Sequence, residues 1–128
     1  LALEGAGRAP ASLNARPPAA PIAGAVLFYP YCGEGTWSRL AAWKQSPATL
    51  MFTAGRDSVV SPAECRDAAA KLTREGIAVD LVDYPDTDHA FDDATLLGGP
   101  YAYFYDAASA ADSQQRVSAF LGALASVK

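Results

Sequence analysis

The segment from Leu50 to Asp92 reads LMFTAGRDSVVSPAECRDAAAKLTREGIAVDLVDYPDTDHAFD. Its residue types predict a strand over about 49–54, a Gly-Arg-Asp loop, a helix over about 62–75 and a second strand over about 78–84. A strand–helix–strand unit of this length crosses over right-handedly, so its two strands run parallel and end at the same edge of a sheet. The segment therefore predicts an α/β fold.

The predicted helix carries signals at both ends. Ser61 suits the N-cap, Pro62 the first helical position and Glu64 the third. Gly76 favours an end just after the helix, because glycine readily adopts the left-handed backbone conformation found there. Apolar residues recur at helical spacing and predict a buried face of Cys65, Ala68, Ala69 and Leu72.

Further elements are predicted on both sides of this segment. An apolar run predicts a strand over about 25–30, of the kind found in the centre of a parallel sheet. The strand over 78–84 carries two aspartates, which favours a place nearer the sheet edge. Residues 8–21, rich in proline and alanine, predict a long loop. A helix is predicted over about 110–127, with an apolar face of Ala111, Val117, Phe120, Leu121, Leu124 and Val127.

Composition limits the classes of partner. The 128 residues are 51% hydrophobic and 19% charged, which is enough apolar material for a buried core. The net charge of −4 argues against a nucleic-acid partner, because phosphate binding requires a basic surface. No apolar run approaches the roughly 20 residues of a membrane span.

Two residues with catalytic potential follow neighbouring predicted strands. Asp57 comes just after one strand, and His89, the only histidine in the chain, comes just after the next. Sites in open α/β sheets form outside the carboxyl ends of parallel strands, so the two side chains are expected to meet. A carboxylate that holds an imidazole is the orienter–base pair of a nucleophile triad. The alternatives are an Asp57 that only shapes its turn and a His89 that is only a polar surface residue.

Three segments resemble the dienelactone hydrolase family: residues 25–33 (AVLFYPYCG), 54–65 (AGRDSVVSPAEC) and 84–92 (YPDTDHAFD). The resemblance covers about residues 23–128 and the C-terminal half of that fold. It implies that residues 1–128 form a single, partial α/β-hydrolase domain. It also implies a triad acid at Asp57, a triad base at His89, a small ester or lactone as substrate, and no cofactor.

The third member of a triad is not evident in the sequence. No G-x-S-x-G or G-x-C-x-G motif precedes Asp57, although the nucleophile precedes the acid in this fold. Cys32 lacks a glycine two positions before it and a helical pattern after it, while Ser58 and Ser61 suit turn and cap positions. We therefore expect the second part of a hydrolase, inactive alone, that begins just after its nucleophile elbow. The alternative is a non-catalytic α/β binding or interaction module.

Either interpretation implies a partner for the sheet. A partial α/β domain exposes an unpaired strand edge and an apolar face. We therefore expect the chain to need its own N-terminal half or a second copy. Side chains expected to line a substrate pocket are Cys32, Trp37 and Phe91, although Trp37 and Trp43 also suit packing on a sheet edge.

Two further questions stay open from the sequence. Cys32 and Cys65 either form a disulfide or remain buried free thiols, and the sequence favours free thiols. A disulfide would favour an oxidising compartment such as the periplasm, whereas free thiols fit the cytoplasm. The acid-rich loop also offers potential metal ligands: Asp86, Asp88, His89, Asp92 and Asp93. Their spacing matches no calcium-binding motif, so no metal is predicted.

Overall fold

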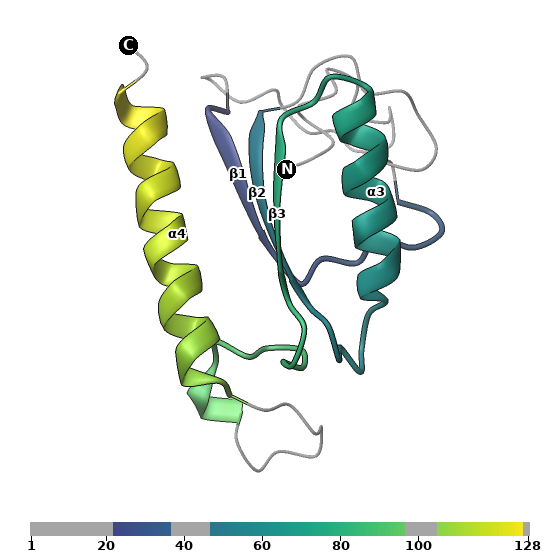
Figure 1. Ribbon diagram of the computed structural model, residues 1–128, viewed down its shortest axis with the longest axis vertical. Coiled ribbons are helices and arrows are strands. Elements are labelled where there is room, and N and C mark those ends of the chain that lie inside the picture. Colours follow the sequence, from purple (N-terminus) through teal and green to yellow (C-terminus); the bar gives the residue numbers. More distant parts are fainter. Residues whose placement is uncertain (1–21, 37–46, 97–104, 127–128) are drawn as a thin grey trace, which may run out of the picture.

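The computed structural model describes residues 22–36, 47–96 and 105–126. Strands β1 (Gly24–Phe28), β2 (Ala48–Ala54) and β3 (Val79–Tyr84) form a parallel sheet in that order. Figure 1 shows this sheet between two helices, α3 (Pro62–Arg74) and α4 (Ala107–Ser126), and a short 3₁₀ helix, η1 (Ala94–Leu96), precedes α4. The predicted α/β fold with parallel strands is confirmed.

Strand β2 forms the centre of the described sheet. It pairs with β1 and β3, and all its residues after Ala48 are buried. Strand β3 lies at one edge and exposes Asp80 and Asp83, as its sequence predicts. Strand β1 was expected at the centre, but among the described residues it pairs only with β2 and most of its residues are half-buried.

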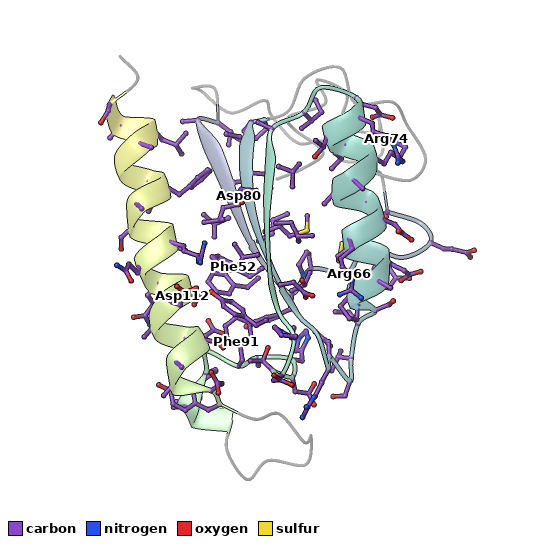
Figure 2. The ribbon with its side chains drawn as sticks, viewed as in Figure 1. Phe52, Arg66, Arg74, Asp80, Phe91 and Asp112 are labelled. Carbon is purple, nitrogen blue, oxygen red and sulfur yellow. A yellow bond between two sulfur atoms is a disulfide. The ribbon has the colours of Figure 1, made fainter. Side chains whose placement is uncertain are left out.

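The two-residue period of β2 divides the core between the two faces of the sheet. Met51 points to the side of α3, where it packs with Cys65 and Ala68. Leu50 and Phe52 alternate with it and form the core on the side of α4 (Figure 2). Partly buried residues complete this second cluster, among them Val26, Phe28, Val117 and Phe120.

Helix α3 follows its sequence closely. The Ser61 side chain accepts a hydrogen bond from the Glu64 amide, and Gly76 has a φ of +82° just after the helix. The four residues of the predicted apolar face are buried. The cap, stop and face of this helix are therefore confirmed.

The predicted apolar face of α4 is correct in part: Val117, Phe120 and Leu124 face the sheet, whereas two other predicted residues do not. Ala111 is exposed and Leu121 is 53% exposed, while Val127 lies outside the described residues. The face that meets the sheet contains Ala110, Ser113, Val117, Phe120 and Leu124. Because α4 is rich in alanine, several stripes along it have similar hydrophobicity, and the large side chains of β1 and β2 decide which is buried.

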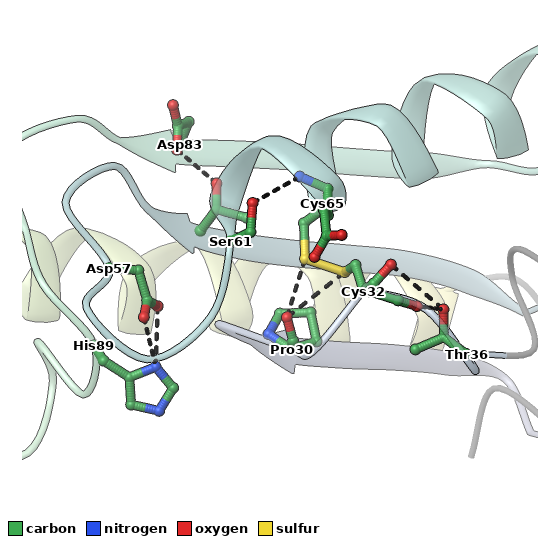
Figure 3. Close-up of a disulfide and its surroundings, with 11 residues drawn as sticks. Pro30, Cys32, Thr36, Asp57, Ser61, Cys65, Asp83 and His89 are labelled. Carbon is green, nitrogen blue, oxygen red and sulfur yellow. Dashed lines mark hydrogen bonds and ion pairs between the residues drawn. A yellow bond between two sulfur atoms is a disulfide. The ribbon is translucent and has the colours of Figure 1, made fainter.

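A disulfide joins Cys32 to Cys65, so the expectation of free thiols is wrong. The bond ties the loop after β1 to the first turn of α3, as Figure 3 shows. Both sulfur atoms lie against the carbonyl oxygen of Pro30, at 3.6 and 3.0 Å. The sequence does not reveal that these two elements approach within a Cα–Cα distance of 5.0 Å.

Some predictions concern residues outside the described ranges: the loop over 8–21, Trp37 and Trp43. In the described part of the chain, no helix is both long and apolar enough to cross a bilayer.

Candidate active site

Asp57 and His89 meet at the carboxyl ends of β2 and β3. The Nδ1 atom of His89 lies 2.9 Å from Oδ2 and 3.2 Å from Oδ1 of Asp57 (Figure 3). The two residues are 32 positions apart in sequence. Parallel pairing of their strands brings them together, as the strand–helix–strand pattern predicts.

The Asp57 carboxylate is almost completely enclosed, with 1% of its side chain exposed. Its Oδ1 atom accepts hydrogen bonds from the backbone amides of Val59, at 2.9 Å, and Val60, at 2.8 Å. These donors and the imidazole compensate for the loss of water around a buried carboxylate. The turn after β2 therefore fixes the direction in which Asp57 faces His89.

The partner of Nδ1 determines the tautomer of His89. A carboxylate only accepts hydrogen bonds, so Nδ1 carries the proton and donates a hydrogen bond to Asp57. The lone pair of the neutral ring is then on Nε2, which faces away from Asp57 in Figure 3. The His89 side chain is 19% exposed. This arrangement suits a base that takes a proton at Nε2.

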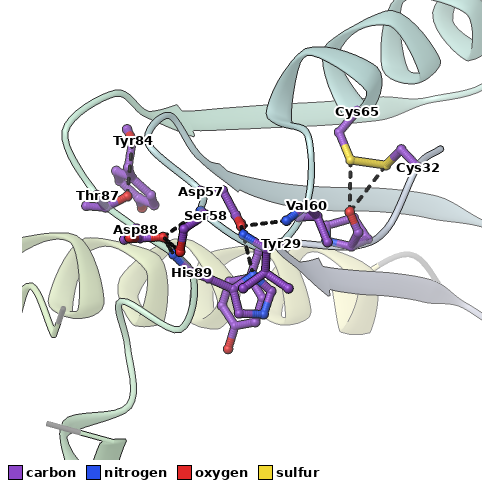
Figure 4. Close-up of polar contacts among 12 residues, drawn as sticks. Tyr29, Cys32, Asp57, Ser58, Val60, Cys65, Tyr84, Thr87, Asp88 and His89 are labelled. Carbon is purple, nitrogen blue, oxygen red and sulfur yellow. Dashed lines mark hydrogen bonds and ion pairs between the residues drawn. A yellow bond between two sulfur atoms is a disulfide. The ribbon is translucent and has the colours of Figure 1, made fainter. Parts of the chain in front are cut away.

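Asp88 joins the two loops that carry the pair. Its Oδ1 atom accepts hydrogen bonds from the amide and hydroxyl of Ser58, at 2.8 and 2.9 Å, and from the His89 amide, at 2.7 Å (Figure 4). Burial acts to raise the pKa of Asp88, but these hydrogen bonds outweigh it and hold the pKa below its ordinary value. Asp86 instead pairs with Arg56 at 2.7 Å on the exposed surface.

Gly55 allows the two loops to pack backbone against backbone. Its amide donates to the Tyr84 carbonyl at 2.8 Å. A Cβ atom at Gly55 would lie 2.5 Å from both Cα and the carbonyl oxygen of Pro85, which no side chain tolerates without movement of the chain. Arg56 continues the contact with a hydrogen bond to the carbonyl of Thr87, at 2.9 Å.

Two residues beside the imidazole have backbone angles that are unusual for non-glycine residues. Tyr29, just after β1, has a φ of 34°, and Ala90, just after His89, has a φ of 59°. The Tyr29 ring lies with its centroid 4.3 Å from that of the His89 ring. Left-handed conformations of such residues cost about 1–3 kcal/mol and cluster at functional sites.

Comparison with known proteins identifies the family of the chain. The model of the dienelactone hydrolase family matches residues 7–125. The chain belongs to the dienelactone hydrolase family.

The structure of this family member is similar to a solved structure, that of the carboxylesterase Cest-2923 from Lactobacillus plantarum WCFS1. The TM-score is 0.66 and the sequence identity is 11%. At that identity the likeness shows the α/β-hydrolase fold alone. The match covers 94% of this chain and 53% of the carboxylesterase, so the chain spans about half the length of that protein. No curated protein matches the sequence significantly.

Two of the three residues predicted to line a substrate pocket lie among the described residues. Phe91 is 0% exposed and packs in the core with Leu50 and Phe52. Cys32 is 6% exposed and held in the disulfide. Trp37, the third predicted pocket residue, lies outside the described residues.

The alternative nucleophile and metal sites find no support in the described ranges. Ser58 donates its hydroxyl hydrogen to Asp88, and Ser61 caps α3. Within residues 22–36, 47–96 and 105–126, no three or more histidine, cysteine or acidic side chains converge to hold a metal ion.

Tyr29 is the site residue that the sequence interpretation missed. It follows β1 as Asp57 follows β2 and His89 follows β3. The rule that selected the other two residues, a polar side chain just beyond a parallel strand, would also have selected Tyr29.

Proposed function

We propose that this chain supplies the acid and the base of a catalytic triad that hydrolyses a small ester or lactone. The supporting observation is the short contact between the enclosed Asp57 carboxylate and Nδ1 of His89, the sole histidine of a chain that belongs to the dienelactone hydrolase family. Such a pair leaves Nε2 as the basic atom.

In the proposed reaction, Nε2 of His89 takes the proton of a serine hydroxyl or cysteine thiol as that nucleophile attacks the ester carbonyl. Asp57 stabilises the resulting imidazolium. The proton then passes to the leaving alcohol or, in a lactone, to the ring oxygen, and an acyl-enzyme remains. In the second half of the reaction His89 takes a proton from water as the water attacks the acyl group. The imidazolium then returns that proton to the leaving serine or cysteine, which releases the acid and restores the nucleophile.

We place the nucleophile outside the described residues. Ser58, Ser61 and Cys32 are engaged in a loop contact, a helix cap and a disulfide. The carboxylesterase of similar fold is about twice as long as the matched region, and β1 pairs on one side only among the described residues. We therefore propose that the remaining part of the hydrolase fold adds its strands along the outer edge of β1.

The disulfide also supports a proposal about location. Disulfides persist in oxidising environments and are rare in the cytosol of mesophiles. The Cys32–Cys65 bond therefore favours an extracytoplasmic location, the alternative that the sequence associates with a disulfide.

The proposed function is tested by the hydrolysis of p-nitrophenyl acetate by the intact protein. We expect His89→Ala to abolish turnover, because no other imidazole in this chain can replace the base. Asp86→Asn is the matched control: it changes an acid of the same loop that only pairs with Arg56 on the surface, and it should leave the rate unchanged. Turnover in His89→Ala at the wild-type rate would refute the proposal.

A further inference from the structure

Tyr29 contacts the proposed base through two separate groups. We infer that Tyr29 is a positioning residue that holds the His89 imidazole, with its ring packed on the imidazole and its hydroxyl tied to Asp92 in the same loop. The kinetic part of this inference rests on the proposed function, whereas the structural part concerns the orientation of the imidazole alone.

The ring contact fixes His89 from a direction that Asp57 does not cover. The two ring centroids are 4.3 Å apart, and the ring planes are inclined by 56°. Figure 4 shows the Tyr29 ring beside the imidazole, while Asp57 meets the Nδ1 edge. The hydrogen bond to Asp57 restrains the direction of Nδ1, and the Tyr29 ring restrains rotation of the imidazole about that direction. Together they fix where Nε2 lies.

The hydroxyl contact fixes the loop that carries His89. The Tyr29 hydroxyl donates to Oδ1 of Asp92 at 3.1 Å, three residues beyond His89. Burial and then the negative charge of Asp92 raise the pKa of Tyr29 to about 12. The phenol therefore keeps its proton and remains a donor over the pH range in which an ester hydrolase works.

The backbone of Tyr29 is itself held in place. Its amide donates to the Phe52 carbonyl at 2.8 Å, one residue beyond the paired part of β1. The φ of 34° turns the chain sharply just after this bond and before Pro30. Left-handed backbone at a tyrosine persists only where the surroundings over-determine it. The contacts with His89 and Asp92 are part of those surroundings.

Tyr84 provides a matched control for Tyr29. Like Tyr29, Tyr84 donates a hydrogen bond from its hydroxyl to a carboxylate, here Oδ2 of Asp112 at 2.7 Å. Its ring packs on Phe52 and Phe91, in the same aromatic cluster as Tyr29. Both rings pack in one aromatic cluster, and of the two it is the Tyr29 ring that contacts His89.

The structural test is the NMR spectrum of the intact protein labelled with ¹³C-histidine, in which the His89→Ala variant identifies the His89 signals. The neighbouring aromatic ring should displace these signals through its ring current. We expect the displacement to persist in Tyr29→Phe and Tyr84→Leu and to decrease clearly in Tyr29→Leu. A displacement that is unchanged in Tyr29→Leu, or that decreases equally in Tyr84→Leu, would overturn the inference.

The kinetic test uses the same variants with p-nitrophenyl acetate. We expect Tyr29→Leu to lower kcat by about 10- to 100-fold with little change in KM, because small misplacements of a catalytic group have effects of this size. Tyr84→Leu should keep kcat close to the wild-type value. Tyr29→Phe and Asp92→Ala should have smaller effects that do not add when combined, because each removes the same hydrogen bond.

The two proposals fail in different ways. Activity that survives His89→Ala would refute the proposed function but leave the NMR result to decide whether Tyr29 holds the imidazole. Loss of activity in His89→Ala together with full kcat in Tyr29→Leu would support the proposed function and refute the positioning role. Equal losses of kcat in Tyr29→Leu and Tyr84→Leu would also refute it, because general loss of packing would then explain both.

Discussion

Reduction of the Cys32–Cys65 disulfide should strongly lower the free energy of unfolding. The two cysteines are separated by 33 positions, which sets the size of the loop that the bond closes in the unfolded chain. In the loop-entropy model, closing about 33 residues lowers the entropy of the unfolded chain by about 12.5 cal/mol/K, or about 3.7 kcal/mol at 25 °C. The bond therefore contributes a large share of the roughly 5–15 kcal/mol typical of a domain.

Thermal unfolding followed by circular dichroism measures this effect. The protein is melted in its oxidised form and after reduction with a phosphine, with alkylation and mass spectrometry used to verify complete reduction. For a cooperative unit of this size, a loss of about 3.7 kcal/mol corresponds to a decrease in Tm of roughly 10–15 °C. The thiols remain buried beside Met51 and Ala68, so the core is expected to keep its packing.

The control is the double variant Cys32→Ala/Cys65→Ala. It should melt near the temperature of the reduced protein, and the reductant should not change its Tm. An unchanged Tm after verified reduction of the wild type would refute the argument from loop closure. An equal shift in the double variant would show that the reductant acts elsewhere.

Three further predictions concern the loops around the candidate site. Gly55→Ala should destabilise the protein by about 1–3 kcal/mol in urea unfolding, because its Cβ meets the backbone of Pro85; a neutral effect would contradict this close approach. Asp88 has a lowered pKa, so its stabilisation is present above its unfolded pKa of about 3.9 and lost as pH falls through the folded value. In Asp88→Asn, the midpoint of urea unfolding should therefore fall less than in the wild type as the pH is lowered. Tyr29 has a raised pKa, so its contribution is full below about pH 10 and lost towards about pH 12, and Tyr29→Phe should remove that alkaline loss from thermal melts.

The proximity of Asp57 and His89 could be predicted because it depends on topology. Strand lengths and a helix of about four turns dictate a parallel crossover, and a crossover places successive strand ends at one edge. Neither residue needs a long-range side-chain contact to reach that edge. Helix α3 could be predicted for a different reason: its cap at Ser61 and its stop at Gly76 are local signals in the sequence.

Features that depend on tertiary packing could not be predicted. The disulfide requires that the loop after β1 reach α3, and no local signal encodes that distance. Which of its small residues α4 buries, Ala110 and Ser113 rather than Ala111, depends on how the helix packs against the sheet. The φ of Tyr29 likewise arises from the way β1 ends against the loop of His89.

The central claim is that Asp57 and His89 act as one unit, and a double-mutant cycle tests it most directly. Hydrolysis of p-nitrophenyl acetate by the intact protein is measured for Asp57→Asn, His89→Ala and the double variant. Asp57→Asn should lower kcat by about 10⁴-fold while the fold stays intact. We predict that the double variant is no slower than His89→Ala alone, because groups that act together in a triad have strongly non-additive effects. Losses that multiply, or an Asp57→Asn enzyme with wild-type kcat, would contradict the account.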